Sequence, residues 1–177
     1  MSRILLGVTG SIAAYKAADL THRLTKDGHL VDVVLTKAAA EFITPLTLHT
    51  LSSRPVYSHN QFADNYDDVR HIALARDADV AIIAPASANI IGKLASGIAD
   101  DYLTTVFTAL RTQARLIAPA MNTFMYENPI VQENLAKLIS YGFELIEPTE
   151  ALLACGDIGK GALPAVDVLL QRIYARL

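Results

Sequence analysis

Four segments of this sequence place side chains that can bind anions directly after an apolar run. They are Thr9-Gly10-Ser11-Ile12, Thr36-Lys37, Pro85-Ala86-Ser87-Ala88-Asn89 and Pro119-Ala120-Met121-Asn122. Backbone N–H groups at a glycine turn and a serine hydroxyl favour a phosphate. A side-chain amide both donates and accepts hydrogen bonds, so Asn122 can hold a substrate carboxylate. These residue types therefore point to recognition of an anionic ligand.

The first segment is part of a glycine turn between an expected strand and an expected helix. Its glycines stand at Gly7 and Gly10 only, so the pattern is not GxGxxG. Thr36 and Lys37 occupy the place where an acidic residue would hold an adenosine ribose. A mononucleotide phosphate is thus favoured over a dinucleotide. The alternative interpretation is a plain tight turn in which Ser11 caps a helix.

The third and fourth segments also allow two interpretations. Ser87 and Asn89 are good helix caps, and they can equally form a second polar wall around the same ligand. Met121 and Met125 are residue types that more often belong to a core than to a site.

Two further residues are candidates for proton transfer. His71 lies at an expected helix start, where a lone histidine is usually a surface or capping residue, as we interpret His22, His29, His49 and His59. Cys155 is the only cysteine, in a stretch whose glycines predict a flexible loop of the kind that covers a site. It is either a buried small hydrophobe or a proton donor or nucleophile. Lys160, nearby, is either a solvated lysine or a charge that attracts a phosphorylated substrate.

The elements that must position these groups alternate between strand and helix. Apolar runs of strand length are nearly continuous in apolar character, which is typical of strands buried on both faces. The predicted strands are 4–8, 30–35, 80–84, 116–118 and 143–146, and the predicted helices are 13–27, 99–112 and 130–141. This order predicts an α/β fold, a three-layer doubly wound parallel sheet of Rossmann-like or flavodoxin-like type, in one domain spanning 1–177. Ligands of such sheets bind beyond the carboxyl ends of the strands, where the four segments lie.

Composition narrows the class of protein. The chain has 177 residues, 52% of them hydrophobic, and a net charge of −3, which gives no general attraction to nucleic acid or acidic membranes. No apolar run approaches the roughly 20 residues needed to span a bilayer. A single cysteine excludes an internal disulfide and a multi-cysteine metal site, so we expect a cytoplasmic protein without a metal. The mean hydropathy of +0.31 hints at surface buried between subunits.

Taken together, the motifs resemble those of the homo-oligomeric flavin-containing cysteine decarboxylases, and among them the phosphopantothenoylcysteine decarboxylases of coenzyme A synthesis. The resemblance covers essentially the whole chain. It rests on GSIAAYK at 10–16, His71 before ADVAIIAPASAN at 78–89, GKLASGIADD at 92–101, PAMNTFMYENP at 119–129 and ACGDIGKG at 154–161.

The resemblance implies FMN as the cofactor and assigns roles to residues. The positions that match the FMN site are Gly10, Ser11, Ile12, Thr36, Phe42, Ser87, Ala88, Asn89, Ile90 and Ala120. His71 matches the active-site base, Asn122 the residue that binds the substrate carboxylate, and Cys155 the proton donor. Met125, Ala154 and Lys160 are expected to contact the substrate.

The implied reaction is decarboxylation of 4′-phospho-N-pantothenoylcysteine to 4′-phosphopantetheine. Oxidation of the thiol to a thioaldehyde, by hydride transfer from the thiol-bearing carbon to FMN, creates an electron sink. CO₂ then leaves to give an enethiolate, and the hydride returns with a proton from Cys155. The family's flap usually continues Gly-x-Gly-Arg-Met, whereas Ala162 and Leu163 follow Gly161 here. Lys160 is the nearby cation that can replace the arginine.

The resemblance also implies partners and leaves alternatives open. Family members form trimers, often dodecamers, with FMN at a subunit contact. Many bacterial members carry a phosphopantothenate–cysteine ligase domain, so we expect a fused or separate ligase as a partner. The alternatives are a peptidyl-cysteine decarboxylase of lantibiotic-type peptides and a non-catalytic flavin-binding regulatory subunit. Regulatory relatives carry acidic tails, which this sequence lacks at its end near Leu177, and a flavin prenyltransferase would lack the PAMN segment.

Overall fold

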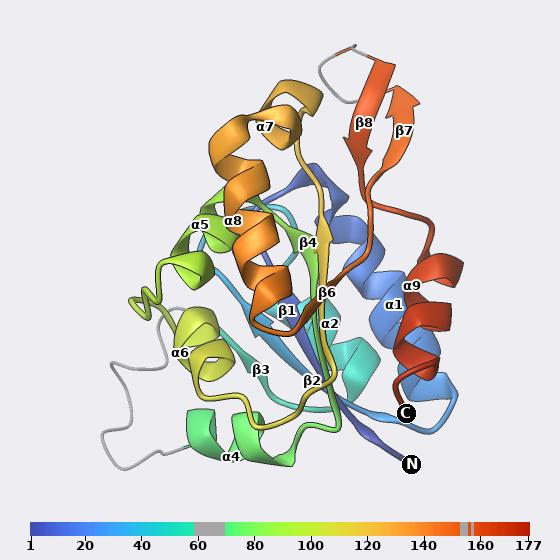
Figure 1. Cartoon of the computed structure of the whole chain (residues 1–177). Helices are drawn as coiled ribbons and strands as arrows, with labels where there is room; N and C mark the ends of the chain where they lie inside the picture. The colour runs from blue at the N-terminus through green and yellow to red at the C-terminus, as the bar shows by residue number, and fades with distance from the viewer. Residues whose placement is uncertain (59–69, 153–155, 157) are drawn as a thin grey trace.

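The computed structural model describes residues 1–58, 70–152, 156 and 158–177. Its centre is a six-stranded sheet in the order β3-β2-β1-β4-β5-β6, and every pairing in it is parallel (Figure 1). The strands are β1 (Arg3–Val8), β2 (Leu30–Leu35), β3 (Val56–Tyr57), β4 (Val80–Ala86), β5 (Arg115–Pro119) and β6 (Phe143–Leu145). The doubly wound α/β fold expected from the sequence is confirmed.

Helices cover both faces of this sheet. On one face lie α1 (Tyr15–Lys26), α2 (Pro45–Ser52) and α9 (Val166–Tyr174), whose buried side chains share a core with β1 and β2. On the other lie α4 (Arg70–Asp77), α5 (Ala88–Ala95), α6 (Tyr102–Thr108), α7 (Thr123–Glu127) and α8 (Pro129–Ser140). The short 3₁₀ helices η1 (Ile12–Ala14) and η2 (Ala39–Glu41) follow β1 and β2.

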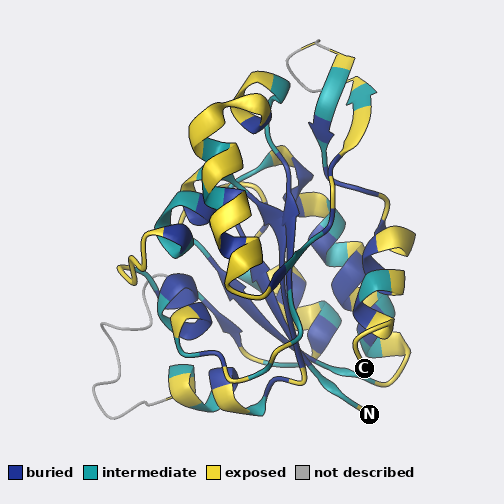
Figure 2. Cartoon of the chain, in the orientation of Figure 1, coloured by how far each residue is buried: buried dark blue, intermediate teal, exposed yellow. Residues whose placement is uncertain are grey.

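The strands are buried on both faces, as their apolar runs predict. Along β1, Ile4 and Leu6 face one core and Leu5 faces the other. Figure 2 shows the sheet as the most deeply buried layer, with the exposed residues on the outer sides of the helices. Gly7 suits this strand, because a Cβ there would lie 3.1 Å from the side chain of Leu103 of α6, which would have to shift. The described residues include no helix that is long and apolar enough to cross a membrane.

Several boundaries differ from the sequence-based prediction. The helix predicted at 99–112 spans Tyr102–Thr108, and it begins later than predicted because Asp101 caps it by accepting a hydrogen bond from the N–H of Thr104. The stretch around Gly159 and Gly161, predicted as a flexible loop, forms a strand instead. Antiparallel β7 (Thr149–Leu152) and β8 (Ile158–Ala162) make a hairpin that projects beyond the carboxyl ends of the sheet (Figure 1).

Candidate functional site

The turns after β1 and β4 are joined by one buried threonine. The hydroxyl of Thr9 donates to the carbonyl of Pro85 at 2.7 Å and accepts from the N–H of Ser87 at 2.9 Å. The turn after β5 joins them, since the N–H of Ala120 donates to the carbonyl of Ala86 at 3.0 Å. Three of the four polar segments thus meet at one edge of the sheet.

Two adjoining cavities open at this edge. The first, of about 430 Å³, is lined by residues from all three joined turns and from the hairpin: Gly10, Ser11, Ile12, Ala13, Tyr15, Lys16, Ser87, Ala88, Ala120, Met121, Asn122, Met125, Leu152, Gly161, Ala162 and Leu163. The second, of about 620 Å³, shares Gly10, Ser87, Ala88 and Met125 with the first. It adds residues from the turn after β2 and from the region before α6: Thr36, Lys37, Ala38, Glu41, Asn89, Lys93, Asp100 and Asp101. Both volumes are typical of small-molecule sites.

The first cavity favours anions. Ser11 and Ser87 cap the helices that begin there, accepting from the N–H groups of Ala13 and Ile90. Their hydroxyl hydrogens can still donate to a ligand. Among the described residues of the lining, only Lys16 carries a charge, and its partial burial lowers its pKa from the usual value. Its ammonium donates to the carbonyls of Leu163 at 2.6 Å and Pro164 at 3.3 Å, which fixes it beside the base of the hairpin.

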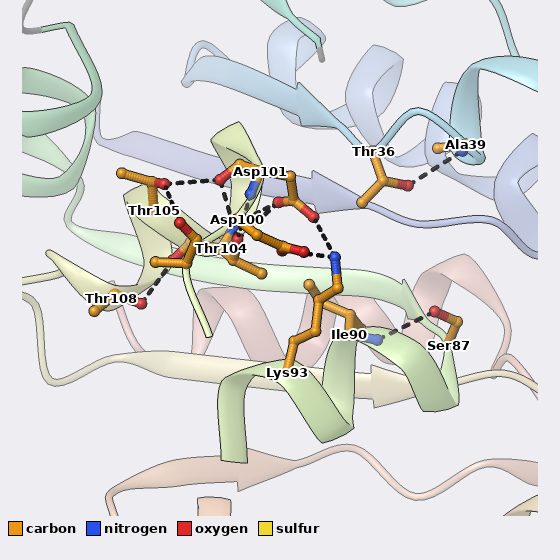
Figure 3. A network of polar contacts seen from close by, with 11 residues as sticks. Thr36, Ala39, Ser87, Ile90, Lys93, Asp100, Asp101, Thr104, Thr105 and Thr108 are labelled. Carbon is orange, nitrogen blue, oxygen red and sulfur yellow. Dashed lines mark hydrogen bonds and ion pairs between the residues drawn. The ribbon is translucent and has the colours of Figure 1, made fainter. Parts of the chain in front are cut away.

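The second cavity has an acidic wall. Figure 3 shows the ammonium of Lys93 between Asp100 and Asp101, at 2.7 and 3.2 Å. The hydrogen bond to Asp100 raises the pKa of Lys93, so the lysine stays charged. Asp101 also caps α6, which ties the wall to a helix start. With Glu41 and Lys37 added, acidic side chains outnumber basic ones here, so an anion is better placed in the first cavity.

Asn122 sits at the start of α7 and lines the first cavity. Its side-chain oxygen accepts from the N–H of Phe124 at 2.9 Å, which makes it the N-cap of that helix. The amide orientation is thereby set, and the amide nitrogen is the group that can donate to a carboxylate.

The hairpin lies against this segment. The N–H of Met121 donates to the carbonyl of Gly161 at 3.0 Å. A Cβ at Gly161 would lie 2.2 Å from the carbonyl oxygen of Met121, and one at Gly159 would lie 2.4 Å from the hydroxyl of Thr123. Only glycine permits this approach, so the alternate glycines serve close packing of a strand on α7.

Most of the predicted site residues line the two cavities: Gly10, Ser11, Ile12, Thr36, Ser87, Ala88, Asn89, Ala120, Asn122 and Met125. Four others line neither cavity. Phe42 is half exposed after η2. Ile90 is fully buried, and its N–H donates to the hydroxyl of Ser87. His71 packs edge-on against Tyr102 with ring centroids 6.5 Å apart, and Lys160 pairs with Glu147 at 2.8 Å. Cys155 and Ala154 lie outside the described residues.

The structure gives roles to residues to which the sequence assigned none of their own. Thr9, Lys16 and Leu163 have structural or lining roles at the first cavity. A signal for Lys16 was present, since it stands one helical turn after Ile12 and closes the GSIAAYK motif. For Thr9 the sequence offers no signal beyond its position after a strand, because its role depends on Pro85, which is distant in the sequence.

Comparisons with known proteins agree over the whole chain. A model of the flavoprotein family matches residues 1–177. A probable phosphopantothenoylcysteine decarboxylase of Streptococcus mutans is 52% identical over 176 residues, which cover 99% of this chain and 98% of that protein. The coenzyme A biosynthesis bifunctional protein CoaBC of Bacillus subtilis is 48% identical over 160 residues. These residues cover 90% of this chain but 39% of the bifunctional relative.

Solved structures agree with the sequence relatives. A mutant of PPC decarboxylase complexed with pantothenoylaminoethenethiol superposes with a TM-score of 0.90 at 35% identity, covering 98% of this chain and 97% of that one. The FMN binding protein AtHal3 has a TM-score of 0.87 at 35% identity, covering 98% and 95%. The chain therefore belongs to the flavoprotein family and, within it, to the flavin-containing cysteine decarboxylases.

Proposed function

We propose that this chain is an FMN-dependent phosphopantothenoylcysteine decarboxylase acting in coenzyme A synthesis. The observation that carries the proposal is the position of Asn122, in the same cavity as two serine-capped helix starts and Lys16. One cavity thus combines groups for a phosphate with an amide for a carboxylate. The relative of Streptococcus mutans, which bears this activity in its name, supports the assignment along its whole length.

FMN fits the residues that are present. Small side chains at Ala88 and Ala120, with Gly10, leave space for a flat ring against the backbone. Ser11 and Ser87 offer hydroxyl groups to a phosphate beside helix starts. Among the described residues, no acidic side chain lines the first cavity, which suits a phosphate there. The name of AtHal3, an FMN binding protein, supports the mononucleotide.

Asn122 is assigned to the substrate carboxylate. The amide nitrogen donates to the carboxylate oxygens, while the amide oxygen stays on the N–H of Phe124. The carboxylate is thereby held at the cavity wall without adding charge. When bound, the flavin supplies an acceptor for the hydride of the thiol-bearing carbon and later returns it, so the overall reaction releases CO₂ without net oxidation.

His71 is assigned to the flavin of a neighbouring subunit. In its own chain it lies against Tyr102, which stacks in turn on Tyr57, outside both cavities. A histidine must come within hydrogen-bond reach of the proton it takes. A homo-oligomer that brings α4 of one copy to the cavities of another meets this requirement, in keeping with a trimer or dodecamer.

Cys155 remains a predicted proton donor, and Ala154 and Met125 remain predicted substrate contacts. A separate or fused phosphopantothenate–cysteine ligase is the expected partner, as the name of the bifunctional relative suggests. A cytoplasmic location is part of the same proposal.

Reconstitution with flavins tests the cofactor. The purified protein is titrated with FMN, FAD and riboflavin while flavin absorbance and fluorescence are recorded. We expect a yellow stoichiometric complex with FMN, and much weaker binding of riboflavin because it lacks the phosphate. A protein that stays colourless after FMN treatment would overturn the proposed function.

A further inference from the structure

Glu147 connects the hairpin to α7 through its side chain. Its carboxylate lies 2.8 Å from the ammonium of Lys160 on β8 and accepts a hydrogen bond of 2.7 Å from the hydroxyl of Tyr126 on α7. The same ammonium lies 5.6 Å from the centroid of the Tyr126 ring. Side chains from α7, from β8 and from the connection between β6 and β7 thus form one cluster.

Tyr126 is the fixed member of this cluster. It is 5% exposed, and its N–H donates to the carbonyl of Asn122 at 3.0 Å. Its own carbonyl accepts from the side chain of Gln132 on α8. Burial, followed by the hydrogen bond to Glu147, raises the pKa of Tyr126 to about 12, so its hydroxyl remains a donor. Tyr126 therefore links the cluster to the helix that Asn122 begins.

The position of β8 has direct consequences for the first cavity. Gly161, Ala162 and Leu163 line it from the hairpin, and Leu152 lines it from β7. The carbonyl of Gly161 also accepts a hydrogen bond from the N–H of Met121, the residue before Asn122. A shift of β8 away from α7 would therefore open the cavity wall opposite the groups assigned to the substrate.

We propose that Glu147, bound by Lys160 and Tyr126, is a positioning residue that holds the hairpin as a wall of the substrate site. The inference rests on the proposed function. It changes the role expected for Lys160, whose ammonium holds the hairpin through Glu147 rather than binding the substrate phosphate.

The size of the effect follows from the exposure of the pair. The side chains of Lys160 and Glu147 are 42% and 57% exposed, so the ion pair is a weak one. If removing Glu147 lowers the fraction of molecules with the hairpin in place, the apparent affinity for substrate falls by the same factor. We expect KM to rise about fivefold. Flavin content and kcat should change less than about twofold, since neither Glu147 nor Lys160 lines the cavities.

The experiment measures KM, kcat and flavin content of the FMN-loaded protein with phosphopantothenoylcysteine and with the unphosphorylated pantothenoylcysteine. The variants are Glu147→Gln, Lys160→Gln, Lys160→Arg and the exchange Glu147→Lys with Lys160→Glu. Glu150→Gln is the matched control: it removes the same charge from β7, close to Glu147 in the sequence, and Glu150 makes no ion pair with any described residue.

Positioning predicts that Glu147→Gln and Lys160→Gln raise KM equally for both substrates. Lys160→Arg and Glu150→Gln should stay near wild type, and the charge exchange should recover most of the loss. If Lys160 instead binds the phosphate directly, Glu147→Gln lowers KM or leaves it unchanged. Lys160→Gln then raises KM for the phosphorylated substrate alone, and the exchange abolishes binding. That pattern, or no change in KM for either single variant, overturns the inference while the proposed function stands. Wild-type protein without turnover overturns both.

Discussion

The side-chain oxygen of Asn122 accepts a hydrogen bond of 2.9 Å from the N–H of Phe124, which fixes the amide at the start of α7. Asn128 makes the same bond with Ile130 at 3.0 Å, at the start of α8, but lines neither cavity. Both are helix caps, and only Asn122 faces the site. Comparing Asn122 with Asn128 therefore distinguishes the structural role of a helix cap from the proposed role in binding the substrate.

Replacing Asn122 by Asp should abolish most of the activity without unfolding the protein. Aspartate caps a helix as well as asparagine does, but it places a second negative charge against the substrate carboxylate. We expect kcat/KM to fall about a hundredfold or more, since a donor to a charged group is lost and a repulsion is added. Steady-state CO₂ release measures this. Asn128→Asp is the control and should stay near wild type. Equal activity of the two variants would remove the assignment.

Gly10→Ala should reduce flavin content. A Cβ at Gly10 would lie 2.6 Å from the Cβ of Ala38, so the turn that lines both cavities must shift. Gly92 in α5 is the control, because a Cβ there meets its nearest neighbour, Asn134, at 3.8 Å. Gly92→Ala should keep full flavin and gain about 0.5–1 kcal/mol of stability from helix propensity. The flavin-to-protein absorbance ratio after gel filtration measures the flavin content of both variants. Full flavin content in Gly10→Ala would show that this turn is not part of the flavin site.

Mixed oligomers test the position of His71. His71→Asn and Asn122→Asp should each be inactive alone. If His71 acts at the flavin of a neighbouring copy, co-assembly in equal amounts should restore about a quarter of the sites. Mixing His71→Asn with the His71→Asn, Asn122→Asp double variant provides the control without intact sites. No recovery from the two single variants would place His71 elsewhere.

Cys155→Ser tests a prediction that rests on the sequence alone. If Cys155 supplies the last proton, the serine variant should still release CO₂ from the first turnover but should liberate the unsaturated enethiol in place of the saturated thiol. Mass spectrometry of single-turnover products distinguishes the two. Saturated product formed at the wild-type rate would exclude this role.

Acid should weaken the attachment of α9. Partial burial works to raise the pKa of Glu144, but hydrogen bonds from Arg172 and Arg176 outweigh it, so the pKa lies below its ordinary value. Because the folded pKa is depressed, this stabilisation is present above the unfolded pKa of 4.5 and is lost as pH falls through the folded value. Glu144→Gln should cost about 1 kcal/mol of unfolding free energy at pH 7 and progressively less in acid. Urea unfolding at a series of pH values measures the difference. A cost that is the same at every pH would show that the charge of Glu144 does not matter.

The sequence predicts the central elements well because long apolar runs are local signals. β1, β2, β4, β5 and β6 lie within a few residues of the predicted runs, and the helix expected at 13–27 divides into η1 and α1. Among the helices that the list of predicted elements lacks, α2 and α9 have clear signals in the sequence. Thr44 and Pro45 are a normal helix start for α2, and Val166, Leu169, Leu170 and Ile173 have the helical spacing of a buried face in α9.

The candidate site was predicted less completely, for a physical reason. Residues after each strand were identified because the carboxyl ends of parallel strands must meet. The glycines at Gly159 and Gly161 predict a loop by composition. The structure gives another reason for them, namely the nearby backbone of Met121 and the side chain of Thr123. The pairing of Lys160 with Glu147 likewise depends on tertiary contacts that no local pattern encodes.

The most direct test of the central claim is CO₂ loss, detected by mass spectrometry, from phosphopantothenoylcysteine and from a peptide that ends in cysteine, each supplied at the same concentration to the FMN-loaded protein. Our account predicts rapid release of CO₂ from phosphopantothenoylcysteine, formation of 4′-phosphopantetheine, and little reaction with the peptide. Decarboxylation of the peptide in preference to the pantothenoyl substrate, or of neither substrate by fully flavin-loaded protein, would contradict it.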